Sequence, residues 1–208
     1  MRPPRLILVT ATDVVPEREL VARIDAAARL PVPERLEIAV QLRDPALSGR
    51  ELFALGERLR RATRTLGIGF IVNDRLELAV ALEADGVHLG RRSVGVRDAR
   101  ALVGAGAWIS VSCHAPEDVG AALDADIDAV LLSPIFASPG KGAPLGLEGL
   151  RRARALFAAH GERRRPLSLY ALGGVDAGSV RSCLEAGADG VAAIRADLVS
   201  TLARSLAT

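Results

Sequence analysis

The chain contains a single lysine, Lys141, among 27 basic residues, and all the others are arginines. This lysine lies in SPIFASPGKGAPLG (residues 133–146), a segment rich in Ser, Pro and Gly, which give a loop a tight and defined shape. A lysine ammonium is a compact charge on a flexible stem, which suits a point contact to phosphate. Lys141 is either an ordinary surface cation or part of an anion site, and its position in this loop favours the anion site.

Two further segments carry the residue types of a phosphate site. Gly173 and Gly174 in LGGV allow backbone N–H groups to approach an anion closely, because glycine has no side chain in the way. Ile194 and Arg195 lead into ADL, where the first turn of a helix would aim more N–H groups at the same point. The glycines could instead form only a tight turn, and Arg195 could point to solvent; we favour phosphate binding.

His114, in the segment SCH, is the candidate for proton transfer. Imidazole changes charge near neutral pH, so it serves as a general acid or base. His88 lies inside an apolar run, GVHL, and could be a hydrogen-bonded core residue, whereas His160 fits a polar surface role. Cys113 lies at the end of a predicted strand, and we expect it to be packed rather than nucleophilic.

Polar residues also follow two other apolar runs, in the segments VQLRD and VND. Arg43 can bind phosphate oxygens with both arms of its guanidinium, or it can form an ordinary surface salt bridge with Asp44. Asn73 can donate and accept hydrogen bonds. Asp74 can bind a metal ion, or it can cap the helix that follows.

Eight short apolar runs, rich in Val, Ile and Leu and without polar alternation, indicate parallel strands that are covered on both faces. Amphipathic stretches separate them, and eight strand–helix units in 208 residues predict an α/β protein, a single (β/α)8 TIM barrel over residues 1–208. A doubly wound open sheet is the alternative, which the lack of G-x-G-x-x-G after the first run weakens. The runs are Leu6–Thr10, Leu36–Leu42, Ile68–Val72, Gly86–Leu89, Trp108–Ser112, Asp128–Leu132, Leu167–Leu172 and Gly190–Ile194.

The barrel explains why the polar residues above matter, because sites in this fold form at the C-terminal ends of the strands. Local signals support the helices: Ser48 and Glu51 have the spacing of a capping box. The segments EADGVHL and EAGADGVAAI share an Ala-Asp-Gly-Val step, which we interpret as a common helix-to-strand turn. The predicted strand ends hold Thr10, Gln41, Arg43, Asn73, Asp74, His88, Ser112, His114, the loop 133–141, Gly173, Gly174, Ile194 and Arg195.

The composition excludes several classes of function. A net charge of +2 and an aromatic content of 3 % argue against a nucleic-acid surface, which needs a basic patch with stacking aromatics. We interpret the arginine runs at Arg58–Arg64 and Arg163–Arg165 as solvated surface. Two cysteines are too few for a disulfide framework, and no apolar run approaches a membrane span, so we expect a cytoplasmic protein.

Taken together, the motifs resemble the thiamine-phosphate synthase / TenI-like thiazole tautomerase family. The resemblance rests on VQLRD, FIVNDRLELAVALEADGVHLG, VSCHAPEDV, SPIFASPGKGAPLGLEGL, ALGGV and EAGADGVAAIRA, in the family's order and over nearly the whole chain. It implies a (β/α)8 barrel that binds a thiazole phosphate. Synthases join this phosphate to a pyrimidine methyl diphosphate with Mg²⁺ and release pyrophosphate, whereas tautomerases move a proton on a thiazole carboxylate phosphate.

The sequence departs from the synthase pattern in two loops that the resemblance assigns to a second anion. Pro45 replaces the lysine of Gln-x-Arg-x-Lys, and the loop around Lys141 has lost one of two hydroxyls and keeps the other as Ser138. Lys141 itself matches a lysine that contacts pyrophosphate in synthases. By resemblance, the pyrophosphate or second-anion site consists of Gln41, Arg43, Asn73, Arg91, Ser138 and Lys141.

A third departure concerns the metal. Ser93 stands where synthases have a Mg²⁺-binding Asp, so only Asp74 of the usual pair remains. Mg²⁺ needs one or two carboxylates besides phosphate oxygens, and charge stabilisation on a leaving pyrophosphate should therefore be weaker. Arg91 could bind an anion directly at the vacated position.

Three hypotheses follow. The first is a TenI-like thiazole tautomerase, in which His114 moves the proton, the glycine amides hold the phosphate and no cofactor is required. The alternative is a divergent thiamine-phosphate synthase that uses Mg²⁺. The third is a non-catalytic barrel that binds a phosphorylated ligand or regulates another protein. In each, the partner is a phosphorylated small molecule rather than nucleic acid or membrane, and a homo-oligomer remains open.

Overall fold

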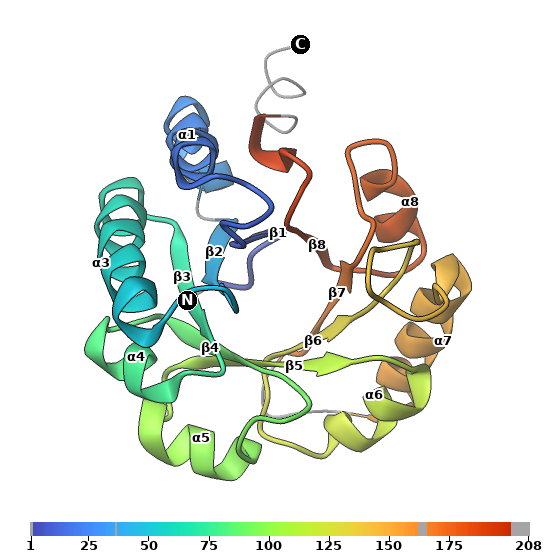
Figure 1. The fold of residues 1–208 in the computed structure, drawn as a ribbon. Coiled ribbons are helices and arrows are strands. Elements are labelled where there is room, and N and C mark those ends of the chain that lie inside the picture. Colours follow the sequence, from blue (N-terminus) through green and yellow to red (C-terminus); the bar gives the residue numbers. More distant parts are fainter. Residues whose placement is uncertain (1, 36, 162–165, 201–208) are drawn as a thin grey trace.

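The computed structural model describes residues 2–35, 37–161 and 166–200, and these form a closed barrel of parallel strands (Figure 1). Each strand pairs with the next along the chain, and β1 pairs with β8 to close the ring. The (β/α)8 prediction is confirmed, and the open-sheet alternative is wrong. The strands are β1 (Leu6–Val9), β2 (Ile38–Leu42), β3 (Gly69–Asn73), β4 (Gly86–Leu89), β5 (Trp108–Cys113), β6 (Ala129–Leu132), β7 (Ser168–Leu172) and β8 (Gly190–Ala193).

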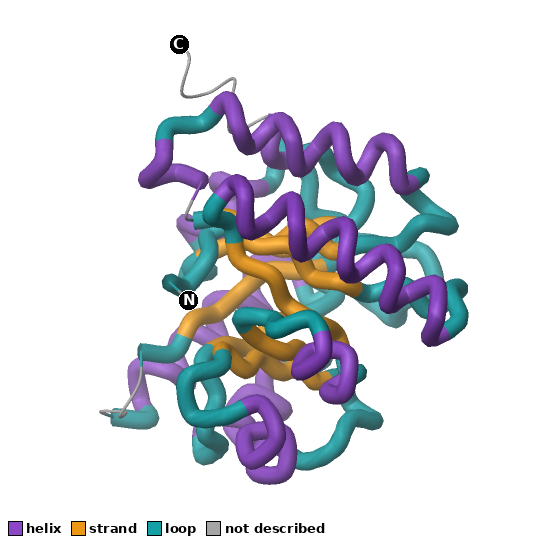
Figure 2. Tube along the Cα trace, turned by 90° about the vertical axis from the view of Figure 1, so that its left-hand side faces the viewer, coloured by secondary structure: helices purple, strands orange, loops and turns teal. Residues whose placement is uncertain are grey.

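Helices surround the strands, and the side view shows them outside the central barrel (Figures 1 and 2). Among the described residues, no helix is long and apolar enough to cross a membrane. Part of the predicted C-terminal helix and the run Arg163–Arg165 lie outside the described residues. The helices are α1 (Glu17–Ala26), the 3₁₀ turn η1 (Ala27–Arg29), α2 (Val32–Arg35), α3 (Gly49–Leu66), α4 (Leu76–Ala81), α5 (Val96–Val103), α6 (Pro116–Leu123), α7 (Gly146–Ala159) and α8 (Val180–Glu185).

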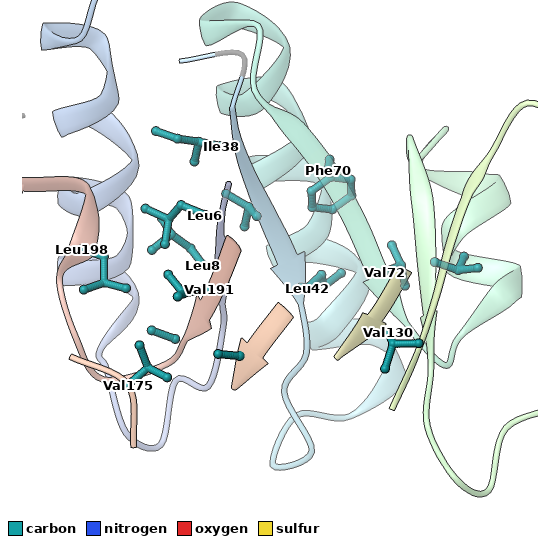
Figure 3. Close-up of a cluster of buried hydrophobic side chains, with 14 of the residues drawn as sticks. Leu6, Leu8, Ile38, Leu42, Phe70, Val72, Val130, Val175, Val191 and Leu198 are labelled. Carbon is teal, nitrogen blue, oxygen red and sulfur yellow. The ribbon is translucent and has the colours of Figure 1, made fainter. Parts of the chain in front are cut away.

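Both faces of the strands are buried, which explains their continuous apolar sequences. One face packs against the helices, and Figure 3 shows part of this layer, including Leu8, Ile38 and Val130. The other face fills the barrel with Ile7, Val9, Ala39, Ile71, Trp108, Ala129, Leu131, Tyr170 and Ala192.

Two large rings fill the N-terminal end of the barrel. Trp108 and Tyr170 meet edge to face with centroids 6.1 Å apart, and the Tyr170 hydroxyl donates to the Pro4 carbonyl at 2.5 Å. Glycines allow close packing against both residues: a Cβ on Gly86 would lie 2.3 Å from the Trp108 backbone carbonyl oxygen, and one on Gly190 would lie 2.8 Å from the Tyr170 ring. This end is therefore a packed plug.

The predicted Ala-Asp-Gly-Val turn exists, and it occurs a third time as Asp128-Ala-Val. In each copy an Asp directly before an even-numbered strand accepts from a backbone amide of the preceding strand. The contacts are Asp85 with Phe70, Asp128 with Ile109 and Asp189 with Leu169, each at 2.8 Å.

An arginine from a nearby helix completes each copy. Arg60 pairs with Asp85 at 2.9 Å, Arg100 with Asp128 at 3.1 Å and Arg154 with Asp189 at 2.6 Å. The same guanidinium also donates to the carbonyl two residues before the Asp, on Glu83, Asp126 or Gly187. We call these three units the Arg–Asp pairs; each fixes a helix to a strand entrance.

Helix α3 confirms the predicted capping box, but the prediction of solvated surface for the run Arg58–Arg64 is wrong at Arg60, whose side chain is only 13 % exposed. Its capping box joins Ser48 and Glu51, with the Ser48 amide donating to the Glu51 carboxylate at 2.9 Å. Within the run Arg58–Arg64, Arg58 pairs with Glu17 and Arg64 with Glu83, on half-exposed side chains. These cations are thus matched by carboxylates of neighbouring elements.

Candidate active site

A chain of polar side chains crosses the C-terminal ends of β2 and β3. The Gln41 Nε2 donates to the Asn73 Oδ1 at 3.1 Å, and the Asn73 Nδ2 donates to the Asp74 Oδ2 at 2.8 Å. The carboxylate can only accept, so it fixes the orientation of both amides. Gln41 is 2 % exposed, and its Oε1 is buried without a partner among the described residues. This oxygen is an acceptor that a ligand N–H or O–H could satisfy.

The Asp74 carboxylate binds the β4–α5 loop and does not cap helix α4. Its Oδ1 accepts from the Gly90 amide at 3.0 Å and from the Ser93 hydroxyl. Helix α4 begins after Arg75, without a side-chain cap. Asp74 has a φ of 59°, in the left-handed region that Asp adopts more readily than most residues. The helix-cap interpretation is therefore wrong.

His114 follows β5 and is held on two sides. Its backbone amide donates to Asp118 at 2.9 Å, and its Nδ1 lies 2.9 Å from the Ser133 carbonyl oxygen. Since a carbonyl only accepts, the Nδ1 carries a proton, and the Nε2 of the neutral ring keeps its lone pair. The ring is half-buried. This arrangement presents an oriented base.

His88 is the core histidine that its apolar run suggested. It is 3 % exposed, and its two ring nitrogens lie 2.8 Å from the Ser110 and Ser112 hydroxyls. Its pKa is lowered to about 4, mainly by burial; the Asp74 charge opposes this shift, and the charges of Arg43 and His114 contribute to it. His88 is therefore neutral at pH 7 and lies beneath the charged residues at the C-terminal end.

The other reactive residue types do not join this group. Cys113 is buried, and burial raises its thiol pKa to about 12, as expected of a packed cysteine. His160 ends helix α7 and lies 3.7 Å from an Asp124 carboxylate oxygen, in the polar surface role expected of it.

Arg43 directly follows β2, which ends at Leu42, and its charge is not paired within the described residues. Thr10 holds its backbone, accepting from the Arg43 amide at 2.9 Å and donating to the Arg43 carbonyl at 3.0 Å. Asp44 instead accepts from the amide and hydroxyl of Thr12, both at 2.6 Å. The Arg43–Asp44 salt bridge is absent, and no described carboxylate pairs with the half-buried Arg43.

The loops after β4 and β6 add exposed cations. Arg91, Arg92 and Lys141 are exposed and form no ion pair among the described residues. The Lys141 amide donates to the Ser138 carbonyl at 3.2 Å, which closes the turn that carries it. Ser138 is half-buried in the same turn. Positive charge thus remains uncompensated at this end of the barrel.

Gly173 and Gly174 pack against the β6–α7 loop. Their φ angles are 93° and 67°, and a Cβ would lie 2.9 Å from the Pro134 Cα or 2.7 Å from the Ala137 carbonyl oxygen, respectively. The Ile135 and Phe136 amides donate to the carbonyls of Leu172 and Gly173, at 3.0 and 2.9 Å.

This packing leaves two glycine amides open. In a trans peptide the C=O and the following N–H point in opposite directions. The N–H groups of Gly173 and Gly174 therefore point away from the β6–α7 loop, and neither has an acceptor among the described residues. The geometry includes the tight turn that was the alternative prediction, and it also provides two free donors.

The loop after β8 has the same property. The carbonyls of Ile194 and Arg195 accept from the Arg23 guanidinium, at 3.0 and 2.9 Å. The amides of Arg195 and Ala196 consequently point the other way, without an acceptor in the described part of the chain. The Arg195 side chain is exposed. Two neighbouring loops thus present unpaired N–H groups.

Comparisons with known proteins match this arrangement to one family. The family model described as "Thiamine monophosphate synthase" matches residues 6–196. The chain belongs to this family. The match spans all eight strands and both loops with open amides.

The family's relatives include proteins named thiamine-phosphate synthase. The protein from Methanoculleus marisnigri is 40 % identical over 174 residues, covering 80 % of this chain and 79 % of that protein. The protein from Gloeobacter violaceus is 36 % identical over 194 residues, covering 92 % of this chain. The chain spans 52 % of that relative's length.

A solved structure agrees with these sequences. "Thiamine phosphate pyrophosphorylase from Pyrococcus furiosus" superposes with a TM-score of 0.77 at 26 % identity, covering 98 % of this chain and 93 % of that one. The family and the barrel that the sequence motifs indicated are both confirmed.

The Mg²⁺ that synthases of the family use has a limited set of ligands here. Among the described residues, no group of three or more His, Cys, Asp or Glu side chains could hold a metal. Asp74 supplies one carboxylate, and the neighbouring Ser93 supplies a neutral hydroxyl. Mg²⁺ is often held by one or two carboxylates plus substrate phosphates. The residues therefore fit a Mg²⁺ ion only if phosphate oxygens of a ligand supply most of its remaining ligands.

Sequence reasoning missed three groups that support the site. They are Arg23, Asp118 and the carbonyl of Ser133, which hold the β8 loop, the His114 backbone and the His114 ring. Asp118 could have been found from HAPED, because Pro at the start of a helix and Asp two residues later mark its first turn. Arg23 gives no local signal, since its partners lie 171 and 172 residues away.

Proposed function

We propose that this chain is a thiamine-phosphate synthase, which joins a thiazole phosphate to a pyrimidine methyl diphosphate and releases pyrophosphate. The names of its relatives support this activity over the tautomerase, which was the first hypothesis from the sequence. The observation that carries the proposal is that two kinds of anion-binding group, unpaired cations and open backbone amides, occur at one end of the barrel among the described residues. A joining reaction has two phosphorylated substrates, whereas a tautomerase has one.

The thiazole phosphate would bind the open amides of Gly173, Gly174 and Arg195, and Ile194 would line the same site. Backbone N–H groups at β7 and β8 are the usual phosphate site of this fold. Backbone amides suit a phosphate that stays on its substrate, because they bind the phosphate oxygens without placing a flexible charged side chain beside them.

The diphosphate would bind the unpaired cations of Arg43, Arg91 and Lys141, with the Ser138 hydroxyl as a further donor. When its C–O bond breaks, negative charge accumulates on the leaving pyrophosphate, and fixed cations stabilise that charge. Asp74 would hold Mg²⁺, which supplies further charge neutralisation when it is bound.

The Gln41–Asn73 chain suits the pyrimidine ring better than the anion site first expected of it. The unpartnered atom of Gln41 is an oxygen, and a carbonyl oxygen repels phosphate but accepts from a ring amino group. Asn73 keeps Gln41 in this orientation through its own bond to Asp74.

The assay for this function mixes the protein with thiazole phosphate, pyrimidine methyl diphosphate and Mg²⁺ and detects thiamine phosphate by mass. Multiple turnovers are expected, and the Lys141→Ala variant should raise the KM for the diphosphate. No product, under conditions in which an established synthase works, would contradict the proposal.

The metal site gives a second test. Ser93→Asp restores a carboxylate beside Asp74 and should lower the Mg²⁺ concentration needed for half-maximal rate. Ser93→Asn is the matched control, because it has similar size without the charge. Equal behaviour of the two variants would remove Asp74 and its neighbour from the metal site.

A tautomerase is the second candidate, and one observation favours it. The His114 ring is held by Ser133, and its Nε2 has no partner among the residues that the structure describes, as proton transfer on a bound ring requires. The thiazole carboxylate phosphate tests this activity. His114→Ala should abolish tautomerisation, and an unchanged rate would remove the acid–base role.

A further inference from the structure

Arg23 is a buried charge outside the barrel. It lies on helix α1, its side chain is 8 % exposed, and it pairs with Glu19 one turn earlier at 2.6 Å. Its Nη1 and Nη2 also donate to two consecutive carbonyls, those of Ile194 and Arg195. A surface salt bridge with Glu19 would not require burial. The hydrogen bonds to the carbonyls of Ile194 and Arg195 explain why the guanidinium is buried against the β8 loop.

The guanidinium suits this geometry because it is planar and carries several N–H donors in a rigid fork. Both of its terminal nitrogens are occupied, so two peptide planes of the β8 loop are held in one orientation. Trans peptides place the amides of Arg195 and Ala196 on the opposite side from their bound carbonyls. The Arg195 amide is one of the N–H groups assigned above to the substrate phosphate, and the Ala196 amide adjoins it on the same side of the loop.

The β7 loop achieves the same result in another way. There, the amides of Ile135 and Phe136 hold the carbonyls of Leu172 and Gly173. The β8 loop has no backbone donors in that place among the described residues, and Arg23 supplies them. The Arg23 side chain thus orients the peptides of the β8 loop, as the backbone amides of the β6–α7 loop orient those of the β7 loop.

We propose that Arg23 is a positioning residue for the phosphate site, which fixes the β8-loop amides from behind without contacting the ligand. The inference rests on the proposed phosphate site but not on the reaction that follows binding. Its positive charge, buried behind those amides, also favours an anion on their far side.

The test begins with the unmodified protein, titrated with inorganic phosphate while amide chemical shifts are followed by NMR. The amides of Arg195 and Ala196 should move together with those of Gly173 and Gly174. Shifts confined to the glycines would overturn the role of Arg23, and an absence of any shift would overturn the phosphate site itself. This measurement does not depend on whether a variant folds.

Variants then separate positioning from support of the fold. Arg23→Gln should raise the Kd for phosphate about tenfold, which corresponds to about 1.4 kcal/mol, while the glycine amides still respond. Arg23→Lys should be intermediate, because one ammonium cannot hold two carbonyls in a fixed fork. Arg58→Gln is the matched control. Arg58 of α3 pairs with Glu17 of α1, the helix that carries Arg23, but this pair lies on the surface.

Turnover of the two substrates is measured separately on the same proteins. If Arg23→Gln loses phosphate affinity while the unmodified protein makes no thiamine phosphate, the positioning role stands and the proposed reaction falls. If the unmodified protein turns over and Arg23→Gln keeps both its phosphate Kd and its KM, the reaction stands and the positioning role is overturned.

Discussion

The two ends of this barrel handle charge in opposite ways. At the N-terminal end, Arg60, Arg100 and Arg154 each bind an aspartate and a carbonyl, and the rings of Trp108 and Tyr170 fill the interior. At the C-terminal end, Arg43, Arg91 and Lys141 have no carboxylate partner among the described residues, and backbone amides of two loops lack acceptors.

The difference shows how one fold separates stability from binding. A cation that is already paired gains little by meeting a phosphate, because it would have to give up its carboxylate. An unpaired cation or amide costs stability until a ligand arrives, and such groups occur where the strands end and the loops begin. Substitutions at each end of the barrel test this separation.

Removing a cation from the N-terminal end should damage stability alone. In Arg100→Met, Asp128 loses a partner at a site where both side chains are less than 15 % exposed, so we expect a loss of about 3 kcal/mol in the free energy of unfolding. Urea unfolding measures this loss, and phosphate affinity should stay within about twofold. Arg97→Met, an exposed position on the same helix, is the control. A fall in phosphate affinity would break the separation.

His88 lies between the two ends, and its burial predicts acid sensitivity. Its pKa is about 4 when folded and 6.5 as an ordinary histidine, so the unfolded chain binds the extra proton between these values. Stability should therefore fall as the pH drops from about 6.5 to about 4, by about 2 to 3 kcal/mol from this residue. Urea unfolding at a series of pH values, compared with His88→Gln, isolates the effect. Parallel curves for the two proteins would contradict it.

Removing a cation from the C-terminal end should lower activity and leave stability nearly unchanged. Arg43→Gln deletes a charge that has no carboxylate partner in the described part of the chain, so the free energy of unfolding should change by less than about 0.5 kcal/mol. The value of kcat/KM should fall by about 10- to 100-fold, mainly through the KM for the diphosphate. Steady-state kinetics measure this, with the exposed helix residue Arg50→Gln as control. An unfolding loss matching that of Arg100→Met would show that both ends serve stability.

Local sequence predicted the parts of this molecule that local physics decides. Strands buried on both faces are continuously apolar, and the Ser48–Glu51 capping box is a short-range contact, so both were predictable. The mistaken cases involve distant partners. Asp44 follows Arg43 in sequence but binds Thr12, and Asp74 precedes a helix but binds Ser93, because loops of neighbouring strands meet only in the closed barrel.

Replacing Arg58 should have the smallest effect on the free energy of unfolding. It tests whether burial is what makes the Arg–Asp pairs stabilising. Arg58 lies two residues from Arg60 on α3 and also binds a carboxylate, at 2.7 Å, but its side chain is 46 % exposed against 13 % for Arg60. Water already solvates this pair, so Arg58→Met should cost less than about 0.5 kcal/mol. Urea unfolding of Arg58→Met and Arg60→Met in parallel measures the contrast. If the two losses were equal, burial would not be the cause, and the Arg–Asp pairs would be ordinary surface salt bridges in a regular array.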